Sequence, residues 1–586
     1  DNVVKKLKSS GFTNSNGGED GMYSLKIQPE TLDPKTGKIR SSYDFDKFRV
    51  EIKSMVNIQE YCKTNDLKRL VDTKNCVDII KKNDVFVNDE PIKSAEFDSF
   101  NFRVTYKKED TVSKTGKVGS EIITNWNKSK KQFRYINRVT FRSPTSPIVV
   151  DLSVVRSSTL INRHLIKTYN IAEANVFNNP EIYEIEVEVD TAEAKLAYAG
   201  KPEALVKDLE NVIKTVLSGL QKTNYPISNT EQDKVIISYL KVLYEKEDKQ
   251  HGRNEPRTRA YPNNFIGPSS KTLQRKHIST IDTDINIPNV TEPYAFCVTD
   301  KADGDRHLLY VNDIGKIYLI NTNMGVIFTG AKSNNPICFN SIIDGELIIH
   351  NKNGSFINTY AAFDVYYIDN VDIRSRPFMK VPGQSDKIYE NGVRLSMLRM
   401  FVKELQPVSI VVKETSGIKI PQLLDLNAAV TSSPINITVK NFYPTFQSND
   451  HDKDDKDDKD DKANKYSIFE ACGSIWQRYK DDLFPYNVDG LIFTPTLFGV
   501  GSNKIGCAGP SKKLTWDYSF KWKPEEYNTV DFLVSTKKGT DGNDIITPIF
   551  ESGKNMYESS QFNQYKTLIL SVGYNEKRHG YINPCQ

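Results

Sequence analysis

The sequence predicts an α+β protein of several domains, and three observations support this. The chain has 586 residues, more than one ordinary core of roughly 100 to 250 residues accommodates. A strand-rich block at about 44–190 is followed by a block of mixed strands and helices at about 229–527. A further strand-rich stretch begins after Pro524. We therefore expect domains at 1–228, 229–527 and 528–586.

The individual elements follow from hydrophobic periodicity. Apolar residues recur at three- and four-residue spacing over 202–221, which predicts an amphipathic helix that closes the first domain. A second helix is expected at about 231–245. The second block contains apolar runs typical of strands at 307–310, 317–320 and 341–349, and a helical pattern at 393–405. The last stretch predicts strands at 530–534 and 567–572.

Composition excludes several classes of protein. No run of about 18 apolar residues is present, so we predict no membrane segment, and the first residues lack the apolar stretch of a secretory signal. The seven cysteines are scattered and never spaced as CxxC, which argues against disulfides and zinc. The net charge of +4 is small for this length, so any nucleic-acid contact must come from local basic surfaces. The composition indicates an intracellular protein.

Charged side chains gather on one face of several predicted strands. Because successive side chains of a strand point to opposite faces, residue parity assigns each to a face. The charged faces contain Lys47, Arg49, Glu51 and Lys53; Arg103 and Lys107; Arg134, Arg138 and Arg142; and Glu184, Glu186 and Glu188. For any one strand, the better interpretation is an antiparallel sheet with a solvated face. Several such strands together favour a closed barrel whose polar interior binds a divalent metal and a polyanion such as a triphosphate.

This pattern resembles the triphosphate tunnel metalloenzymes, which include RNA 5′-triphosphatases. The resemblance rests on the run Tyr183-Glu184-Ile185-Glu186-Val187-Glu188, on the strand with Arg134, Arg138 and Arg142, and on Val150-Asp151-Leu152. It implies that Glu184, Glu186 and Glu188 hold a metal. It also implies a triphosphate site made of Arg103, Lys107, Arg134, Arg138, Arg142 and Asp151. The family has two Glu-rich strands, and the second would fall before Asp1.

A second constellation lies downstream in the mixed block. The segment Lys301-Ala302-Asp303-Gly304-Asp305-Arg306 has the form KxDGxR. It is followed in order by Asp344-Gly345-Glu346, Phe363-Asp364-Val365-Tyr366, Val488-Asp489-Gly490-Leu491-Ile492 and Phe520-Lys521-Trp522-Lys523-Pro524. Taken singly, a surface lysine, turn dipeptides and a core phenylalanine explain these residues better. Turns do not explain the lysine context or the last segment, so the ordered set favours a common site.

The chemistry of this set is coherent. A nucleophilic lysine must be neutral, and lowering its pKa from about 10.4 to about 7.5 requires roughly 4 kcal/mol of environmental bias. Lys521 and Lys523 share strand parity, so both can face a phosphate and neutralise charge that develops on it. Asp489 and Glu346 carry oxygens that suit Mg²⁺ or Mn²⁺, and the ring of Phe363 offers a stacking face for a purine.

These motifs resemble the covalent nucleotidyltransferases, which comprise mRNA guanylyltransferases and polynucleotide ligases, over roughly 290–540. The resemblance implies that Lys301 is the nucleophile and that Lys521 and Lys523 hold the α-phosphate. It assigns the nucleotide to Arg306, Glu346, Phe363 and Asp303, and the metal to Asp489. It also implies a C-terminal OB-fold, of which only the start, from about Val530, is present. The family's last motif has no secure counterpart here.

The order of the two constellations is similar to that in capping enzymes of large nucleocytoplasmic DNA viruses, especially the mimivirus-like ones. This likeness implies a guanylyltransferase coupled to an RNA 5′-triphosphatase, with GTP and 5′-triphosphate RNA as substrates and Mg²⁺ or Mn²⁺ as cofactor. It implies a cap methyltransferase domain or subunit as a further partner, and a location in the host cytoplasm or the virion. An ATP-dependent polynucleotide ligase and a catalytically silent RNA-binding subunit remain the alternatives.

Overall fold

The computed structural model describes residues 1–15, 21–30, 47–73, 76–162, 164–253, 255–279, 288–410, 433–444, 446–447, 466–527, 531–548 and 564–573. It divides into two compact units, Asp1–Leu220 with Val530–Gln586 (unit 1) and Gln221–Thr529 (unit 2). The first division falls after Leu220, and the domain boundary near residue 228 stays a prediction. The C-terminal stretch groups with unit 1, so a separate third domain stays a prediction.

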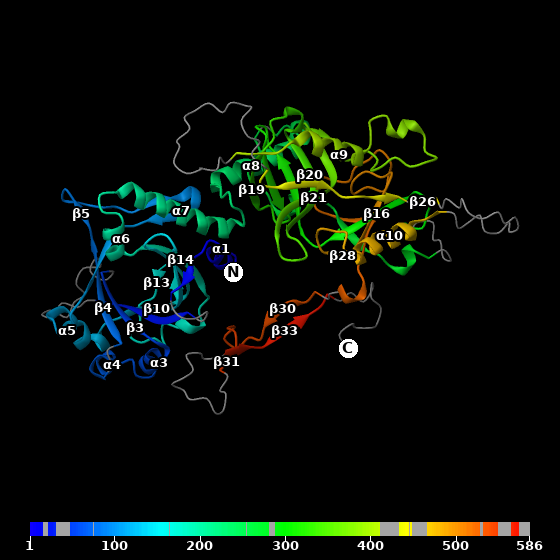
Figure 1. Cartoon of the computed structure of the whole chain (residues 1–586). Coiled ribbons are helices and arrows are strands. Elements are labelled where there is room, and N and C mark those ends of the chain that lie inside the picture. The colour runs from blue at the N-terminus through cyan, green and yellow to red at the C-terminus, as the bar shows by residue number, and fades with distance from the viewer. Residues whose placement is uncertain are drawn as a thin grey trace. The chain divides into compact units, whose positions relative to one another are not determined.

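Unit 1 is built on a curled antiparallel sheet that forms a half-barrel (Figure 1). Its strands follow the spatial order β14-β11-β10-β2-β3-β4-β9, and β1 adds to β10. The strands of this sheet are β1 (Thr13–Asn14), β2 (Met22–Pro29), β3 (Phe48–Lys53), β4 (Val77–Asp84), β9 (Lys107–Thr111), β10 (Lys131–Arg142), β11 (Ile148–Ser157) and β14 (Ile182–Val189). Separate two-strand ladders are β5 (Phe86–Val87) with β6 (Glu90–Pro91), β7 (Ala95–Phe97) with β8 (Phe102–Val104), and β12 (Leu160–Ile161) with β13 (His164–Leu165).

Helices cover the apolar face of this sheet. They are α1 (Asn2–Ser9), α3 (Met55–Thr64), α4 (Leu67–Thr73), α5 (Lys117–Thr124) and α7 (Pro202–Gln221). Helix α6 (Thr191–Ala197) follows β14 and buries none of its residues. Tyr61 of α3 and Leu70 of α4 pack against Val50 and Ile79 of the sheet in one core. A second core joins α1 and α7 to the ends of β10 and β11. Since the helices take the apolar face, the charged face is left on the inside of the curl.

The helix predicted at 202–221 is α7, but one predicted strand is wrong. The segment 102–107 divides into β8 and β9, which lie in different sheets. Arg103 on β8 pairs with Glu96 of β7 and is exposed, so the structure does not bring it to the charged face. The alternating pattern correctly predicts extended backbone in β8 and in β9. It cannot reveal the break between the two strands, because both have the same alternation.

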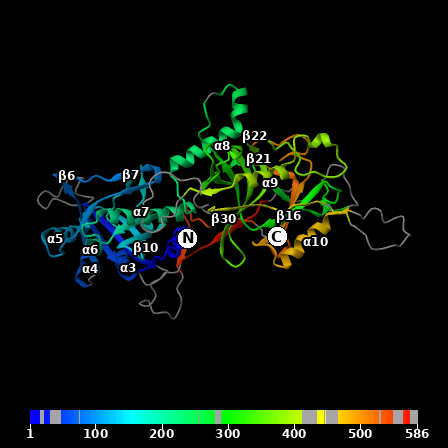
Figure 2. The same cartoon turned by 45° about the horizontal axis from the view of Figure 1, so that its top comes forward.

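Unit 2 contains an eight-stranded sheet buried on both faces. The order is β22-β21-β20-β17-β18-β19-β23, with β24 added to β21. The strands are β17 (Asp305–Val311), β18 (Lys316–Asn321), β19 (Val326–Lys332), β20 (Ser341–His350), β21 (Phe356–Ile368), β22 (Val371–Asp372), β23 (Val408–Ser409) and β24 (Asn436–Val439). Helix α8 (Asn229–Gln250) packs on one face through Tyr239, and α9 (Arg394–Leu405) packs on the other through Leu398 (Figure 2). Double burial explains the nearly continuous apolar runs in these strands.

A smaller five-stranded sheet completes unit 2, in the order β15-β29-β28-β16-β25. Its strands are β15 (Ser269–Thr272), β16 (Phe296–Ala302), β25 (Tyr443–Pro444), β28 (Val488–Pro495) and β29 (Thr515–Trp522), and β26 (Phe446–Gln447) pairs with β27 (Tyr466–Ser467) separately. Helix α10 (Ile468–Lys480) covers one face through Ile468, Ala471 and Ile475. The turn from β16 to β17 carries the chain from the small sheet to the large one.

The described part of the C-terminal stretch forms two ladders, β30 (Leu533–Thr536) with β33 (Leu568–Ser571) and β31 (Ile546–Pro548) with β32 (Gln564–Lys566). An OB-fold here stays a prediction. Among the described residues, no helix combines the length and apolarity that a bilayer crossing requires. The cysteines within the described ranges are free thiols, as predicted.

Candidate nucleotidyl-transfer site

Lys301 lies near the end of β16, opposite Gly490 of β28. Its Nζ donates to both carboxylate oxygens of Asp489, at 2.7 and 3.0 Å. Lys523, just after β29, lies 2.7 Å from the second oxygen of the same carboxylate. Adjacent strands β16, β28 and β29 therefore bring together three residues that the sequence predicted for one site. A single half-buried carboxylate faces two ammonium groups there.

Gly490 allows this close approach of β28 and β29. Its φ is +154°, and a Cβ at this position would lie 2.0 Å from the carbonyl oxygen of Trp522. No side chain fits in that space, so the Asp-Gly sequence is required for packing and is not a turn dipeptide. The glycine places Asp489 next to the strand that carries Lys523.

The turn between β16 and β17 contains Asp303 and Gly304. Asp303 is exposed, and its backbone N–H donates to the carbonyl of Asn487 at 2.9 Å. A Cβ on Gly304 would lie 2.9 Å from the carbonyl oxygen of Leu347, so the turn passes directly over β20. This turn connects Lys301 to Arg306, and the side chain of Asp303 stays in solvent.

Arg306 is held by two residues of the predicted motifs to which the sequence assigned no role. Its guanidinium forms a bidentate pair with Asp344, with 3.0 Å from Nε to Oδ1, and donates to the carbonyl of Pro268 at 2.8 Å. Asp344 is fully buried and also accepts from the hydroxyl of Tyr366. The only signal in the sequence is an aspartate inside an apolar strand. Buried charges require such pairing, so Asp344 and Tyr366 position Arg306.

Glu346 lies opposite Arg306 in the pairing of β20 with β17. Its Oε2 is buried and has no hydrogen-bond partner among the described residues. Burial raises the pKa of this carboxyl to about 7, and the charges of Arg306 and Lys440 oppose the shift. A buried acceptor without a donor is costly, so the site is suited to a ligand that brings a donor, such as a hydroxyl.

The ring of Phe363 on β21 borders the same space. The guanidinium of Arg306 lies 5.5 Å from its centroid and 5.5 Å from that of Phe265. Phe363 is only half-buried, so part of its ring remains open to a ligand. Lys521, in contrast, is exposed on β29 and has no ion-pair partner within the part of the chain that the structure describes. Predicted nucleotide-binding residues from β17, β20 and β21 therefore border one another.

A buried ion pair next to Lys301 was missed in the sequence. The Nζ of Lys440 lies 3.1 Å from Oδ2 of Asp300, and the two side chains are 3% and 4% exposed. Tyr486 donates to the same carboxylate at 3.1 Å. Asp300 directly precedes the predicted nucleophile, so this network fixes the backbone of β16 at Lys301. No local pattern marks Lys440, because it follows a short strand far away in the sequence.

Candidate triphosphate site

The charged faces of unit 1 form one continuous surface. The strand pairing aligns Asp78 of β4, Glu51 of β3 and Lys26 of β2, and then Arg134 of β10 beside Lys26. Arg134 contacts both oxygens of Glu184 at 2.6 Å, and Arg138 pairs with Asp151 at 2.6 Å and with Glu186. Charges of both signs therefore line the inside of the half-barrel, as parity predicted.

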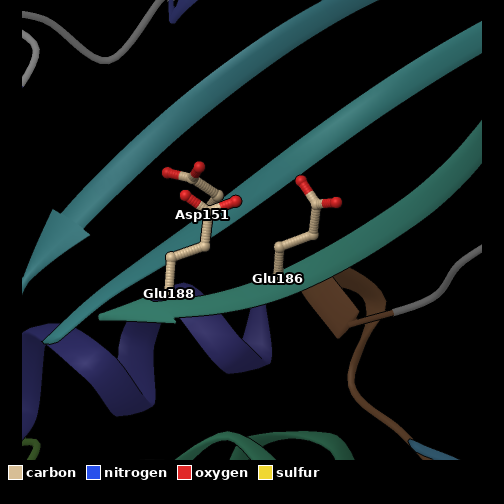
Figure 3. Close-up of side chains that lie close together, drawn as sticks. All are labelled: Asp151, Glu186 and Glu188. Carbon is tan, nitrogen blue, oxygen red and sulfur yellow. The ribbon is translucent and has the colours of Figure 1, made fainter. Parts of the chain in front are cut away.

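Asp151, Glu186 and Glu188 place carboxylate oxygens within 4.8 Å of one another (Figure 3). Asp151 extends from β11, and the two glutamates extend from β14. Burial, followed by the charges of Asp151 and Glu186, raises the pKa of Glu188. Hard oxygen ligands at this spacing suit Mg²⁺ or Mn²⁺, so the donor set fits such a cation.

Two acidic residues have other neighbours than the sequence predicted. Glu184, predicted for the metal, is engaged by Arg134, whereas Asp151, predicted for the triphosphate, joins the carboxylate cluster. Lys107 and Arg142, both predicted for the triphosphate, also have acidic partners. Lys107 on β9 pairs with Asp84. Arg142, the last residue of β10, lies 3.3 Å from Glu193 of α6. Within the described residues, β14 pairs only with β11, so the predicted second Glu-rich strand remains a prediction.

Comparison with known proteins gives two similarities. The model of the mRNA capping enzyme catalytic domain matches residues 243–425. The chain is also 25% identical over 477 residues to a probable mRNA-capping enzyme of Acanthamoeba polyphaga mimivirus. The chain resembles a viral mRNA capping enzyme. The match covers 78% of this chain and 35% of that relative, so the chain spans about a third of the length of the curated capping enzyme.

The matched range contains some of the candidate site residues, and strand pairing brings the others to them. The matched residues include Lys301, Arg306, Glu346 and Phe363, which the structure places on β16, β17, β20 and β21. Asp489 and Lys523 lie beyond the match, at 489 and 523, and reach Lys301 only through strand pairing. Unit 1 lies entirely outside the matched range. The matched range therefore contains the candidate lysine and the residues predicted to bind the nucleotide.

Proposed function

We propose that unit 2 is an RNA guanylyltransferase that forms a covalent lysyl-GMP intermediate at Lys301. The contact of Lys301 with Asp489, which Lys523 shares, is the observation that carries this proposal. The capping-enzyme match over 243–425 supports guanylyl transfer over nucleic-acid ligation. Glu346 and Phe363 provide an acceptor for a ribose hydroxyl and a stacking face for the base.

The reaction has two steps. The neutral Nζ of Lys301 attacks the α-phosphorus of GTP, an N–P bond forms, the bond to the bridging oxygen breaks, and pyrophosphate leaves. The Nζ proton passes to solvent or to Asp489. A terminal oxygen of the RNA 5′-diphosphate then attacks the same phosphorus, the N–P bond breaks, and Lys301 recovers a proton. Lys523 and Lys521 neutralise charge on the α-phosphate, and Asp489 would hold a divalent cation that polarises this phosphate.

Labelling with α-³²P-GTP and a divalent metal tests this function. We expect a label that survives denaturation, is released by acid, and is absent with Lys301→Ala, because the N–P bond requires this amine. Lys380→Ala is the matched control, since Lys380 is exposed in the same unit. Labelling by ATP alone would instead establish a ligase, and RNA binding without any nucleotide adduct would establish a silent subunit.

We further propose that unit 1 removes the RNA γ-phosphate before guanylylation. The carboxylate cluster supports this step, because Asp151, Glu186 and Glu188 would hold a divalent cation that bridges to the triphosphate. Arg138 and Arg134 lie beside the cluster and would bind phosphate oxygens if they exchange their present carboxylate partners for the substrate.

Phosphate release from γ-³²P-labelled triphosphate RNA tests the second step. Glu188→Gln removes one acceptor charge, and we expect the rate to fall roughly 10- to 100-fold, the usual effect of losing a metal-site group. Glu203→Gln on the exposed face of α7 is the control. If the unaltered chain releases no phosphate while it labels with GTP, unit 1 has no triphosphatase activity and the guanylyltransferase proposal is unaffected.

A further inference from the structure

A row of aromatic side chains lies next to the Lys301 site. We define the aromatic row as Trp522, Trp476, Tyr479 and Tyr527. The ring centroids of Trp522 and Trp476 are 5.7 Å apart, and those of Trp476 and Tyr479 are 5.1 Å apart. The hydroxyls of Tyr479 and Tyr527 lie 3.4 Å from each other. Residues from β29, α10 and the turn after β29 thus form one connected surface.

Core packing accounts for only part of this row, because Tyr479 packs against one buried cluster and the other three rings do not belong to it. Helix α10 packs on the sheet through Ile468, Ala471 and Ile475, which are at most 2% exposed. Trp476 and Tyr479, three residues apart, share another face of the helix and are only half-buried. Trp522 is 36% exposed and Tyr527 is 38% exposed. Four large rings that stay accessible to solvent together are typical of a binding surface.

One end of the row lies on the strand that carries Lys521. Trp522 lies between Lys521 and Lys523 in the sequence, and its side chain points to the α10 side of the sheet, so the two lysine side chains point to the opposite face. At the other end, Tyr479 packs against a cluster that contains Ala302 and Val488, the neighbours of Lys301 and Asp489 in the sequence. The hydrogen bond with Tyr479 raises the pKa of Tyr527, with smaller contributions from burial, Glu526 and Asp489. A chain that lies along the row therefore reaches the Lys301 site without crossing the protein.

Positive charge accompanies the rings. The Nζ of Lys352 lies 5.5 Å from the centroid of Tyr479 and pairs with Asp482. Lys480, which follows Tyr479 on α10, is exposed. Glu525 and Glu526 precede Tyr527 and are also exposed, so the local field is only moderately positive. Stacking, with a few phosphate contacts, is the interaction that this surface offers.

We propose that the aromatic row binds the 5′-terminal nucleotides of the RNA acceptor by base stacking. This inference rests on the proposed guanylyl transfer, because it names the site of the second substrate. Aromatic rings bind the π-face that every base presents, so recognition tolerates any sequence. The aromatic row carries isolated lysines and ends near the proposed phosphate-transfer site. These features fit single-stranded RNA better than they fit an apolar peptide.

Fluorescence anisotropy of a short 5′-diphosphate RNA with a 3′ dye tests this site. We expect Trp476→Ala to weaken binding roughly tenfold and Trp476→Phe to stay within about twofold of the unaltered protein, because phenylalanine still stacks. Tyr527→Ala lies outside the core and should also weaken binding severalfold. Tyr261→Ala is the control, since Tyr261 is 62% exposed elsewhere in unit 2. Thermal melting verifies that each variant is folded.

The outcomes separate this inference from the proposed function. If the protein labels with GTP but Trp476→Ala and Tyr527→Ala bind RNA as tightly as the unaltered chain, the aromatic row is not the acceptor site and guanylyl transfer stands. If both variants lose RNA affinity but no GMP adduct forms, the row binds RNA and the proposed function fails. A surface for a protein partner would leave RNA affinity unchanged in every variant, which overturns the inference.

Discussion

At the scale of single residues, the buried charges of unit 2 differ in how they are satisfied. Asp344 has Arg306 and Tyr366 as partners, and Asp300 has Lys440 and Tyr486. Removing one member of such a pair leaves an unpaired buried charge, which typically costs about 3 to 5 kcal/mol. Glu346 is the exception, because its Oε2 has no donor among the described residues. Paired charges maintain the fold, and the unsatisfied one is available for a ligand.

Glu346 makes the stability of unit 2 depend on pH. Burial raises its pKa from the ordinary 4.5 to about 7, so the folded chain binds a proton between these pH values that the unfolded chain releases. This contribution to the free energy of unfolding is complete below about pH 4.5 and is lost as pH rises to about 7. Urea unfolding across this range should show a loss of roughly 3 kcal/mol that Glu346→Gln abolishes.

The matched control for this measurement is Glu390→Gln, since Glu390 is exposed in the same unit. It should retain the pH dependence of the unaltered chain. Equal pH profiles for the unaltered chain and Glu346→Gln would contradict the assignment of this carboxyl as a buried acceptor.

At the scale of elements, the β16, β28 and β29 strands create the site by close approach. Lys301 and Asp489 are 188 positions apart and meet because antiparallel pairing aligns β16 with β28. The spacing of β28 and β29 depends on Gly490, where no Cβ fits. The position of Lys523 relative to Asp489 therefore depends on one backbone contact.

Gly490→Ala tests this dependence. A Cβ 2.0 Å from the carbonyl of Trp522 forces the strands apart, and we expect a loss of roughly 2 to 4 kcal/mol in the free energy of unfolding together with reduced GMP labelling. Gly473→Ala on α10 is the control, because its Cβ would meet nothing within 4 Å. Helix propensity predicts that this control stabilises the chain by about 0.5 to 1 kcal/mol. Equal stability of the two variants would exclude the steric role of Gly490.

At the scale of the whole molecule, the two compact units have separate cores. The half-barrel core of unit 1 and the two-faced sheet core of unit 2 share none of their buried residues. Each core is large enough to unfold cooperatively. The predicted nucleotide residues all lie in unit 2, and the carboxylate cluster lies in unit 1.

Calorimetry therefore should resolve two thermal transitions. The proposed function has GTP bind the folded form of unit 2, which at a hundredfold excess over Kd would stabilise that unit by about 2.7 kcal/mol. GTP should then raise one transition temperature and leave the other in place. ATP serves as the control nucleotide. A single transition that GTP shifts as a whole would show that the units unfold together.

The sequence by itself determined the helix at 202–221, the alternation of charge along the strands, and the order of motifs around Lys301. These features depend on residues within one or two turns or strands, where periodicity has a direct physical meaning. The break that sends Arg103 to another ladder is not visible at that range, because two short strands and one long strand share the same alternation.

Only the tertiary structure decided which charges meet. Arg134 pairs with Glu184, and Lys440 pairs with Asp300. The carboxylate of Asp151 lies close to those of Glu186 and Glu188. Each choice depends on strand register between segments far apart in the chain, and a shift of one residue would send every side chain to the opposite face. The unsatisfied oxygen of Glu346 is likewise a property of the packed site, because burial and the absence of a donor arise only when the strands are in place.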